Sequence, residues 1–334
     1  MRKESLLLFW LLLCGFVMLA PLAHAQSSEV PVTLIELAGP AADADAEISG
    51  LTWYGDTLLL VAENPNLYAS AGYAGAFFTL DKAAIVAYLA SDSPAPLEPE
   101  PLPILSADIP RTIPGFDGFE AAVVQDDTLY LLIEAIAADG TMRGYLVSGA
   151  LSPDGVTLDL ENRVELLPQT DFFNTSYESL LIDDNTLLAF YEANGAVVNP
   201  DAEVYRVSPD LSSSETIPFL PLEYRLTDVT QPDANGLFWG INYFYPGDDF
   251  LAADTDPLAD PRGSTHENYP QVERLVAFQL GADGITLADA DPIWLELEGE
   301  DARNWEGIER LDDRGFLLVT DKYPQTLLGF VPLP

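Results

Sequence analysis

Residues 120–134 read EAAVVQDDTLYLLIE, and the same pattern recurs four more times along the chain. Each copy contains a short apolar strand, a tight polar turn and a second apolar strand. The turns are rich in Gly, Asp and Asn, which adopt the backbone conformations of hairpin turns at little cost, so each copy predicts a β-hairpin. Aligned without gaps, the five copies are residues 49–63, 120–134, 178–192, 228–242 and 306–320.

Further strands follow each predicted hairpin. Third strands are expected at residues 76–80, 144–148, 203–207, 274–280 and 325–331. Fourth strands are expected at residues 102–106, 156–167, 215–220 and 285–297. The last repeat ends without a fourth strand, and the unpaired apolar strand at 32–37 is available to take its place.

Repeats of four antiparallel strands are the signature of a β-propeller. The sequence therefore predicts an all-β fold, a single propeller of five four-stranded blades whose ring is closed by the N-terminal strand, which hides the sheet edges. A sixth blade would have to lie within 64–118 or 243–273, where the motif is absent. The only helix expected is at 82–89.

The first 25 residues have the pattern of a secretory signal peptide. Arg2 and Lys3 are basic, residues 6–19 are apolar, and Ala23-His24-Ala25 is a small-x-small cleavage site. We expect residues 1–25 to be removed and residues 26–334 to form the propeller domain, in a protein that is secreted or periplasmic. After residue 25 no apolar run reaches the roughly 18 residues that a membrane-spanning helix needs.

Composition excludes several classes of function. The chain carries 54 acidic and 14 basic residues, for a net charge of −40, and such a surface repels nucleic acids and anionic membranes. Cys14 and His24 lie in the predicted signal peptide, so the mature chain has no cysteine and only His266. Disulfides, a thiol nucleophile and zinc sites built from Cys or several His are therefore excluded. With 48% apolar residues the chain can still bury a large core.

The first residue of each repeat is expected at one mouth of the propeller channel, because first strands line the channel. Four carboxylates crowded there would repel each other and raise each other's pKa unless a cation bound them. An all-oxygen set favours Ca²⁺, with Mg²⁺ as second choice. The alternative is that these side chains cap backbone N–H groups. The five candidate metal ligands are Ser49, Glu120, Glu178, Asp228 and Glu306.

A second, outer ring is expected from the last residue of each repeat. These residues are Glu63, Glu134, Glu192, Asn242 and Thr320, with Asp321 beside the last. Glu134 and Glu192 are candidates for a catalytic acid or base, and so is His266 in the long loop 243–272. The alternative is that the outer acids and this loop are merely solvated.

Bases near the mouth are the candidates to hold a small anionic substrate in so acidic a protein. They are Arg111, Arg225, Arg303 and Lys322, and the alternative is that they pair with neighbouring acids. Just beyond the fourth repeat, Tyr243, Phe244 and Tyr245 are expected to line a pocket.

The repeat starts resemble those of two secreted propeller families. The relevant runs include Ile48-Ser49-Gly50-Leu51, Tyr177-Glu178-Ser179 and Trp305-Glu306-Gly307-Ile308-Glu309. One family is the bacterial phytase-like, esterase-like propellers, whose blades begin with EGIA-type and SGLA-type motifs. The other is the calcium-activated soluble apyrases, five-bladed nucleotidases. The resemblance spans most of residues 45–334 through short motifs.

The apyrase resemblance implies that Ser49, Glu120, Glu178 and Glu306 hold an axial calcium ion. Gly50 stands where that family has a further acid, and Asp228 replaces a serine-like ligand. The bases that bind nucleotide phosphates in that family have no recognisable counterpart here.

Two functions remain open at the level of sequence. The first is a secreted calcium-dependent hydrolase of phosphate or carboxylic esters. The second is a non-catalytic propeller that uses a structural metal and binds an extracellular ligand, since the fold alone does not decide function. A pocket of about 300 Å³ or more beside the ring, lined by Arg or Lys, favours the enzyme, and a plugged mouth favours the binder.

Overall fold

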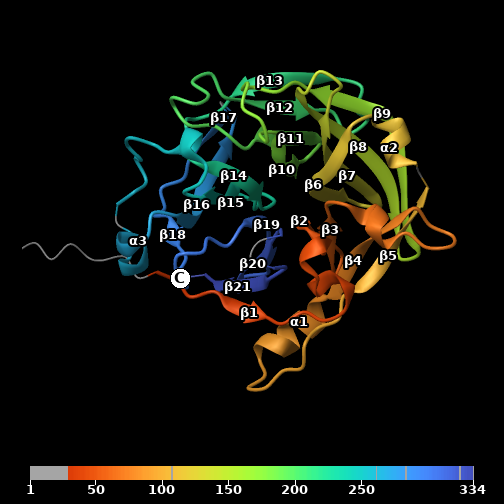
Figure 1. Cartoon of the computed structure of the whole chain (residues 1–334), viewed down its shortest axis with the longest axis horizontal. Coiled ribbons are helices and arrows are strands. Elements are labelled where there is room, and N and C mark those ends of the chain that lie inside the picture. The colour runs from red at the N-terminus through yellow and green to blue at the C-terminus, as the bar shows by residue number, and fades with distance from the viewer. Residues whose placement is uncertain (1–28, 107, 261, 283, 323–324, 334) are drawn as a thin grey trace, which may run out of the picture.

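The computed structural model describes residues 29–106, 108–260, 262–282, 284–322 and 325–333. Its strands are nearly all antiparallel and form units of four or five around one axis (Figure 1). The described part of the protein is therefore an all-β propeller, as the repeats predict. The predicted signal peptide, residues 1–25, lies outside the described residues.

Each unit has its first strand near the axis and its later strands progressively farther out (Figure 1). Unit 1 contains β2 (Ile48–Tyr54), β3 (Thr57–Ala62), β4 (Gly75–Asp81) and β5 (Glu100–Ser106). Unit 2 contains β6 (Phe116–Gln125), β7 (Thr128–Ile136), β8 (Met142–Ser152) and β9 (Gly155–Leu166). Unit 3 contains β10 (Tyr177–Asp183), β11 (Thr186–Tyr191), β12 (Glu203–Val207) and β13 (Ser214–Pro218).

The last two units complete the circle. Unit 4 contains β14 (Arg225–Val229), β15 (Leu237–Phe244), β16 (Val272–Gly281), β17 (Gly284–Leu287) and the short β18 (Ile293–Trp294). Unit 5 contains β19 (Trp305–Leu311), β20 (Gly315–Thr320), β21 (Leu328–Pro332) and the N-terminal β1 (Thr33–Ile35).

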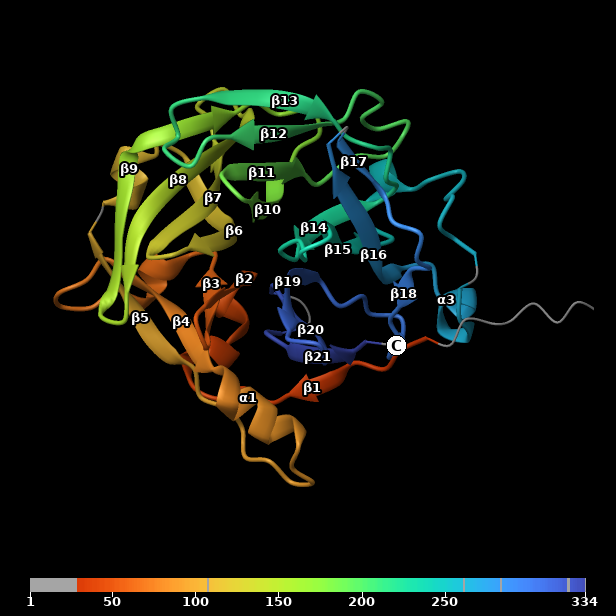
Figure 2. The same cartoon turned by 180° about the vertical axis from the view of Figure 1, so that it is seen from behind.

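The ring is closed in two ways. Around the axis, β2 contacts β6, β6 contacts β10, β10 contacts β14, β14 contacts β19, and β19 returns to β2. At the periphery, β1 pairs antiparallel with β21, with Thr33 opposite Phe330 and Ile35 opposite Leu328. The predicted closure by the N-terminal strand is confirmed, and the view from behind shows β1 as the outermost strand beside β21 (Figure 2).

Units 1 and 2 differ from the prediction of separate blades, because they share one eight-stranded sheet. β5 pairs parallel with β9, with Ile104 opposite Val156. Gly155 permits this approach, since a Cβ at this position would collide with the carbonyl oxygen of Pro103 and its φ is +142°. The joined outer edges leave fewer unpaired strand groups exposed to solvent.

The strand predicted at 285–297 is interrupted, because it forms β17 and β18 with a break between them. The break contains Asp289, Asp291 and Pro292, and proline cannot donate to a strand ladder. The predicted helix is α1 (Lys82–Leu89). Shorter helical segments that the sequence did not indicate are α2 (Ile109–Thr112), α3 (Ser264–Asn268), η1 (Pro40–Ala42), η2 (Ala44–Ala46), η3 (Pro65–Tyr68) and η4 (Asp249–Leu251).

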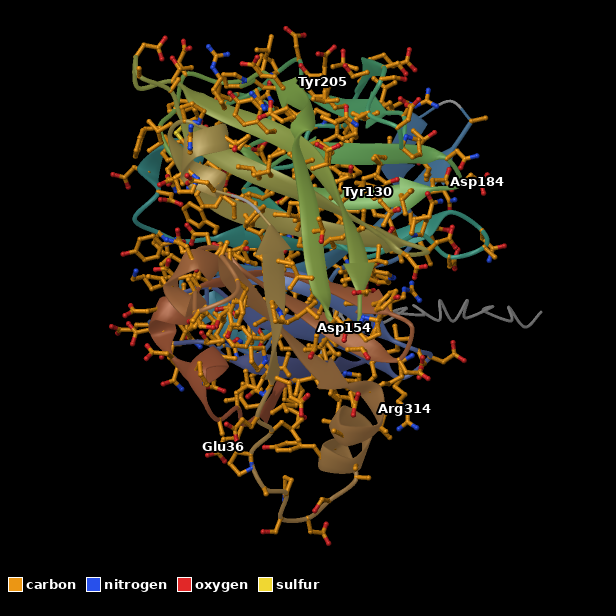
Figure 3. The ribbon with its side chains drawn as sticks, turned by 90° about the vertical axis from the view of Figure 1, so that its right-hand side faces the viewer. Glu36, Tyr130, Asp154, Asp184, Tyr205 and Arg314 are labelled. Atoms are coloured by element: carbon orange, nitrogen blue, oxygen red, sulfur yellow. The ribbon has the colours of Figure 1, made fainter. Side chains whose placement is uncertain are left out.

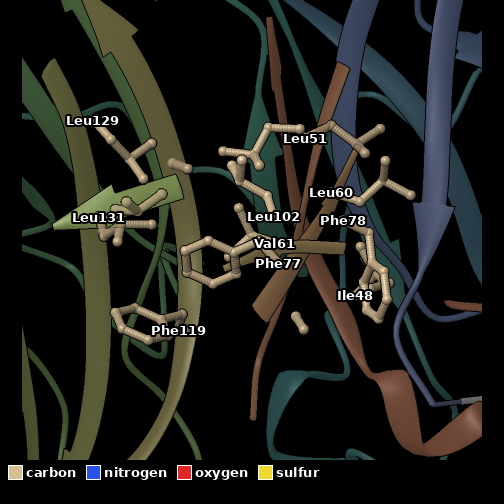
Figure 4. Packing of buried hydrophobic residues seen from close by; sticks show 14 of the residues in the cluster. Ile48, Leu51, Leu60, Val61, Phe77, Phe78, Leu102, Phe119, Leu129 and Leu131 are labelled. Carbon is tan, nitrogen blue, oxygen red and sulfur yellow. The ribbon is translucent and has the colours of Figure 1, made fainter. Parts of the chain in front are cut away.

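The core lies between the faces of neighbouring units. Between units 1 and 2, the rings of Phe77 and Phe119 meet edge to face with centroids 5.5 Å apart, among fully buried Leu60, Val61 and Leu131 (Figure 4). Removing apolar area of this kind from water stabilises the fold by about 25 cal/mol per Å².

The outer surface is polar and charged. Side chains such as those of Glu36, Asp154 and Arg314 end in solvent, with Asp154 at the tip of the long β8–β9 hairpin (Figure 3). Among the described residues, none of the helices has the length and apolar character needed to cross a lipid bilayer.

Candidate functional site at the channel mouth

A β-bulge interrupts each first strand near its start. In β2 the strand pairing skips Ser49, in β6 it skips Glu120, in β10 Glu178 and in β19 Glu306. A bulge leaves one residue outside the ladder and redirects its side chain. The repeat starts of four units thus occupy one equivalent position at the mouth.

Unit 4 differs from the gapless alignment by one residue. In β14 the pairing runs from Leu226–Asn242 to Val229–Gly240, so the position equivalent to Glu306 is Thr227 and not Asp228. The reason is a longer hairpin between β14 and β15. Equivalent outer positions are therefore Glu63, Glu134, Glu192, Tyr243 and Asp321, in place of the predicted Asn242 and Thr320.

Asp228 and Ser49 use their side chains on the backbone of a neighbouring unit. The Asp228 carboxylate accepts a hydrogen bond from the Ile308 N–H at 2.8 Å and is buried. The Ser49 hydroxyl donates to the carbonyl of Phe119. Of the five predicted metal ligands, the structure brings together Glu120, Glu178 and Glu306, and directs Asp228 between β14 and β19.

Seven carboxyl groups form what we call the mouth cluster. Burial raises the pKa of Glu120 well above its usual range, and the charges of Glu134, Glu63 and Glu306 add to this effect. Burial likewise raises the pKa of Glu63 to about 9 and that of Glu134 to about 8. The members are Glu63, Glu120, Glu134, Glu178, Glu192, Glu306 and Asp321.

Among the residues that the structure describes, Glu178 Oε2 and Asp321 Oδ1 of the mouth cluster are buried without a hydrogen-bond partner. Buried polar atoms are usually paired, so these two oxygens have unused capacity to accept a donor or a cation. In the part of the chain that the structure describes, no three acidic, His or Cys side chains already stand in a metal-binding arrangement.

Arg225 is the base that enters the mouth cluster. Its Nη1 donates to Glu192 and, at 3.3 Å, to the carbonyl of Asn174, while its Nε donates to Asp248 at 3.0 Å. Glu192 is fully buried and also accepts from the Ser176 N–H at 2.9 Å. Burial raises the pKa of both Glu178 and Glu192. The charge of Glu192 raises the pKa of Glu178 further, whereas the charge of Arg225 opposes the rise at Glu192.

A pocket of about 720 Å³ opens beside these groups. Glu178 and Glu306 form part of its wall, and Arg225 forms another. Tyr243 and Tyr245 line it as the sequence predicts, whereas Phe244 is buried against Tyr224. The remaining lining residues are Asn174, Asp248, Glu300, Asp301, Ala302 and Asn304.

Two loops meet at this pocket, and their contacts are not evident from the sequence. The loop before β10 carries Asn174, and the loop after β15 carries Asp248. Stacking of Phe172 on Phe250, with ring centroids 4.7 Å apart, holds these loops together. Arg225 bonds to Asn174 and Asp248 as well, so one buried residue positions both walls.

Next to the repeat starts, the first strands of neighbouring units pack closely against each other. A Cβ at Gly50 would lie 3.3 Å from the Cα of Ala121, and one at Gly307 would lie 3.2 Å from the carbonyl carbon of Gly50. These small residues directly follow Ser49, Glu120 and Glu306. Glycine or alanine at these positions therefore allows neighbouring units to approach each other beside the mouth.

The other predicted site residues lie elsewhere. His266 in α3 is 2% exposed, hydrogen bonds through Nδ1 to Glu29 at 2.8 Å and packs on Trp294. Glu134 and Glu192 are buried behind the pocket and do not line it. Of the remaining bases, Arg303 is held by Glu273, Lys322 pairs with Glu47, and Arg111 is exposed on α2, which contacts β9.

A second hollow of about 800 Å³ lies between units 3 and 4 and includes Asp183, Arg206 and Phe219. It contains no member of the mouth cluster. We therefore place the candidate site at the mouth, where the pocket meets titratable groups.

The chain matches no protein-family model and no curated protein. Solved structures similar to it include a glucose dehydrogenase (13% identity, TM-score 0.47, covering 90% of this chain and 99% of that one). Others are the soluble aldose sugar dehydrogenase from Escherichia coli (12%, TM-score 0.43, 90% and 99%) and the catalytic domain of the Coprinopsis cinerea GH62 α-L-arabinofuranosidase (8%, TM-score 0.47, 92% and 98%). Identities and TM-scores this low do not indicate the activity of this chain.

Proposed function

We propose that the channel mouth is the active site of an exported, calcium-dependent hydrolase of carboxylic or phosphate esters. The observation that supports this most is the position of the mouth cluster, whose unpaired oxygens lie beside a pocket that also contains Arg225. The pocket exceeds the roughly 300 Å³ expected of an enzyme site. The resemblance of the repeat starts to phytase-like, esterase-like propellers and to apyrases is consistent with this class of reaction.

The part of the cluster formed by units 1, 2 and 5 suits a divalent cation. Burial raises the pKa of Glu306 and of Glu120, and the charges of Glu63 and Asp321 raise both further. Asp321 Oδ1 has no partner there. An all-oxygen set of Glu63, Glu120, Glu306 and Asp321 favours Ca²⁺ over Mg²⁺ because Ca²⁺ accepts more oxygens in looser geometry. The ion would polarise an oxygen of the substrate.

The opposite side of the mouth suits proton transfer. Glu178 lines the pocket, and its burial together with the charge of Glu192 raises its pKa, which favours the protonated form. It is placed to protonate the oxygen that leaves when an ester is cleaved. Glu192 acts through Glu178 as a positioning residue, since Arg225 and the Ser176 N–H hold it in place. Asn304 donates to Glu306 Oε1 at 2.6 Å and fixes the carboxylate on the far wall.

The second candidate is a non-catalytic propeller with a structural metal and a bound ligand. The burial of Glu134 and Glu192 behind the pocket favours it, because neither predicted base can reach a ligand directly.

A paired measurement separates the two candidates. Metal content is determined on the purified protein, and hydrolysis of 4-nitrophenyl acetate, butyrate and phosphate is followed with calcium and with chelator. The hydrolase predicts turnover that chelator abolishes and that Glu178→Gln lowers at least a hundredfold, whereas Glu298→Gln, an exposed acid outside the pocket, leaves it unchanged. If the protein binds calcium but turns over none of the esters, the non-catalytic binding propeller is the correct function and the hydrolase is not.

A further inference from the structure

The pocket at the mouth is strongly acidic. Five of its lining side chains are carboxylic acids and one is basic among the residues that the structure describes: Glu178, Asp248, Glu300, Asp301, Glu306 and Arg225. Glu300 and Asp301 are exposed at the rim, where a ligand first encounters the site. Like charge at an entrance rejects anions.

Arg225 is already engaged with carboxylates of the protein and so offers little to an incoming anion. Its Nε and Nη1 are already committed to Asp248, Glu192 and the Asn174 carbonyl. A ligand anion would have to compete with two carboxylates that are themselves partly or fully buried. An arginine that is paired in this way positions the wall, and its charge is largely balanced by Glu192 and Asp248.

The pocket is instead rich in groups that accept hydrogen bonds and in aromatic surface. Glu178 and Glu306 line it, and Glu178 Oε2 is buried without a hydrogen-bond partner among the described residues. Tyr245 lines the pocket with 53% of its surface exposed, which is high for a large aromatic side chain. Its ring lies against Gly247, since a Cβ at Gly247 would collide with the ring. The ring is thus supported on one side and open on the other.

We propose that this pocket binds an uncharged carbohydrate, so that the substrate of the proposed hydrolase is a carboxylic ester carried by a neutral sugar. This inference rests on the proposed function for the reaction and on the pocket for the ligand. Sugar hydroxyls donate to the carboxyl oxygens, and the C–H face of a sugar ring packs on Tyr245. In the reaction, the oxygen of water bonds to the acyl carbon and the bond from that carbon to the sugar oxygen breaks. The sugar oxygen takes a proton from Glu178, and a proton of the attacking water restores that of Glu178, so the products are the free carboxylic acid and the sugar.

Binding is tested separately from catalysis, with sugars that contain no ester. Galactotriose, xylotriose and cellotriose are titrated into the mature protein by calorimetry, and trigalacturonic acid serves as the anionic counterpart of galactotriose. We expect at least one neutral trisaccharide to bind, and trigalacturonic acid to bind at least tenfold more weakly than galactotriose. Tyr245→Ala should weaken binding of the neutral sugar about tenfold, equal to about 1.4 kcal/mol. Gly247→Ala should weaken it through displacement of the ring.

Leu287→Ala is the matched control, because Leu287 is 40% exposed on β17 and lies outside the pocket. Melting curves of all variants show that each is folded. Tighter binding of trigalacturonic acid than of galactotriose, no binding of any neutral trisaccharide, or equal affinity in Tyr245→Ala would each overturn the inference. If the natural protein binds a neutral sugar but turns over no ester in the separate 4-nitrophenyl assay, only the proposed hydrolase is overturned.

Discussion

The carboxylate of Asp228 accepts a hydrogen bond from the backbone N–H of Ile308, with the two atoms 2.8 Å apart. This contact joins β14 to β19 and makes Asp228 part of the ring closure between units 4 and 5. Burial raises the pKa of Asp228 well above its ordinary value, with the hydrogen bonds from the Ile308 and Val229 N–H groups opposing this effect, and the rise favours the neutral form.

Asp228→Asn should therefore leave stability at pH 7 within about 1 kcal/mol of the natural protein, since an amide oxygen still accepts from Ile308. Asp228→Ala should lose about 1–3 kcal/mol, because the Ile308 N–H stays buried and unpaired. Urea unfolding measures both. If Asp228 were a metal ligand instead, Asp228→Asn would abolish any stabilisation by calcium, which we expect it to retain.

Calcium should stabilise the protein through the mouth cluster. A cation that binds only the folded state adds about 2.7 kcal/mol at a hundredfold excess over its Kd, so calcium should raise the Tm and chelator should lower it. Glu120→Gln combined with Glu306→Gln should remove most of this response, because amides are weaker ligands. The same double variant should be slightly more stable than the natural protein in chelator, since like charges are removed.

The control for this measurement is Glu36→Gln with Glu161→Gln, two exposed acids far from the mouth. Salt also screens the general negative charge, so all curves are recorded at one high ionic strength. A Tm indifferent to calcium and chelator would reject the cation site.

Glu309 should make stability fall as pH rises. It is 5% exposed, and burial raises its pKa from 4.5 to about 7, with the Arg310 N–H opposing this effect. A carboxyl with a raised folded-state pKa contributes its full stability below the unfolded pKa and loses it as pH rises through the folded pKa. The loss therefore develops from about pH 4.5 to about pH 7 and amounts to about 3 kcal/mol at most.

Glu309→Gln lacks this ionisation. The free energy of unfolding of Glu309→Gln minus that of the natural protein should be near zero or slightly negative at pH 4.5, should rise between about pH 4.5 and about pH 7, and should be constant above pH 7. Guanidinium unfolding at pH 4.5, 6 and 8 measures the difference, and a difference that does not change with pH would contradict the assignment.

Arg225 should be essential for stability as well as for the pocket. Arg225→Gln leaves Glu192 buried without its charge partner, and breaking a buried pair in this way costs about 3–5 kcal/mol. Adding Glu192→Gln removes the stranded charge and should restore much of that loss. A double variant no more stable than Arg225→Gln, in the same urea experiment, would show that the pair is not coupled. Exposed Arg206→Gln, which loses a surface pair with Glu215, should cost less than about 1 kcal/mol.

Where the repeats are regular, the sequence predicts which residues lie at the channel mouth. The equal hairpins of units 1, 2 and 3 place Ser49, Glu120 and Glu178 at one position, because strand geometry and two-residue turns repeat without variation. In unit 4 the longer hairpin shifts the register by one residue, so Thr227 and Tyr243 take the places assigned to Asp228 and Asn242. A gapless alignment cannot detect such a shift, because turn length changes without a change in the apolar pattern.

The amino-acid sequence by itself determined the propeller, the closing strand, α1 and the acidic character of the mouth, since alternating apolar strands, turn residues and charge are local properties. Only the tertiary structure decided which acids share the pocket, that Arg225 is committed to Glu192 and Asp248, and that Phe172 and Phe250 hold the two loops together. These partners lie 20 to 80 residues apart in the chain, where side-chain contacts depend on how the ring closes.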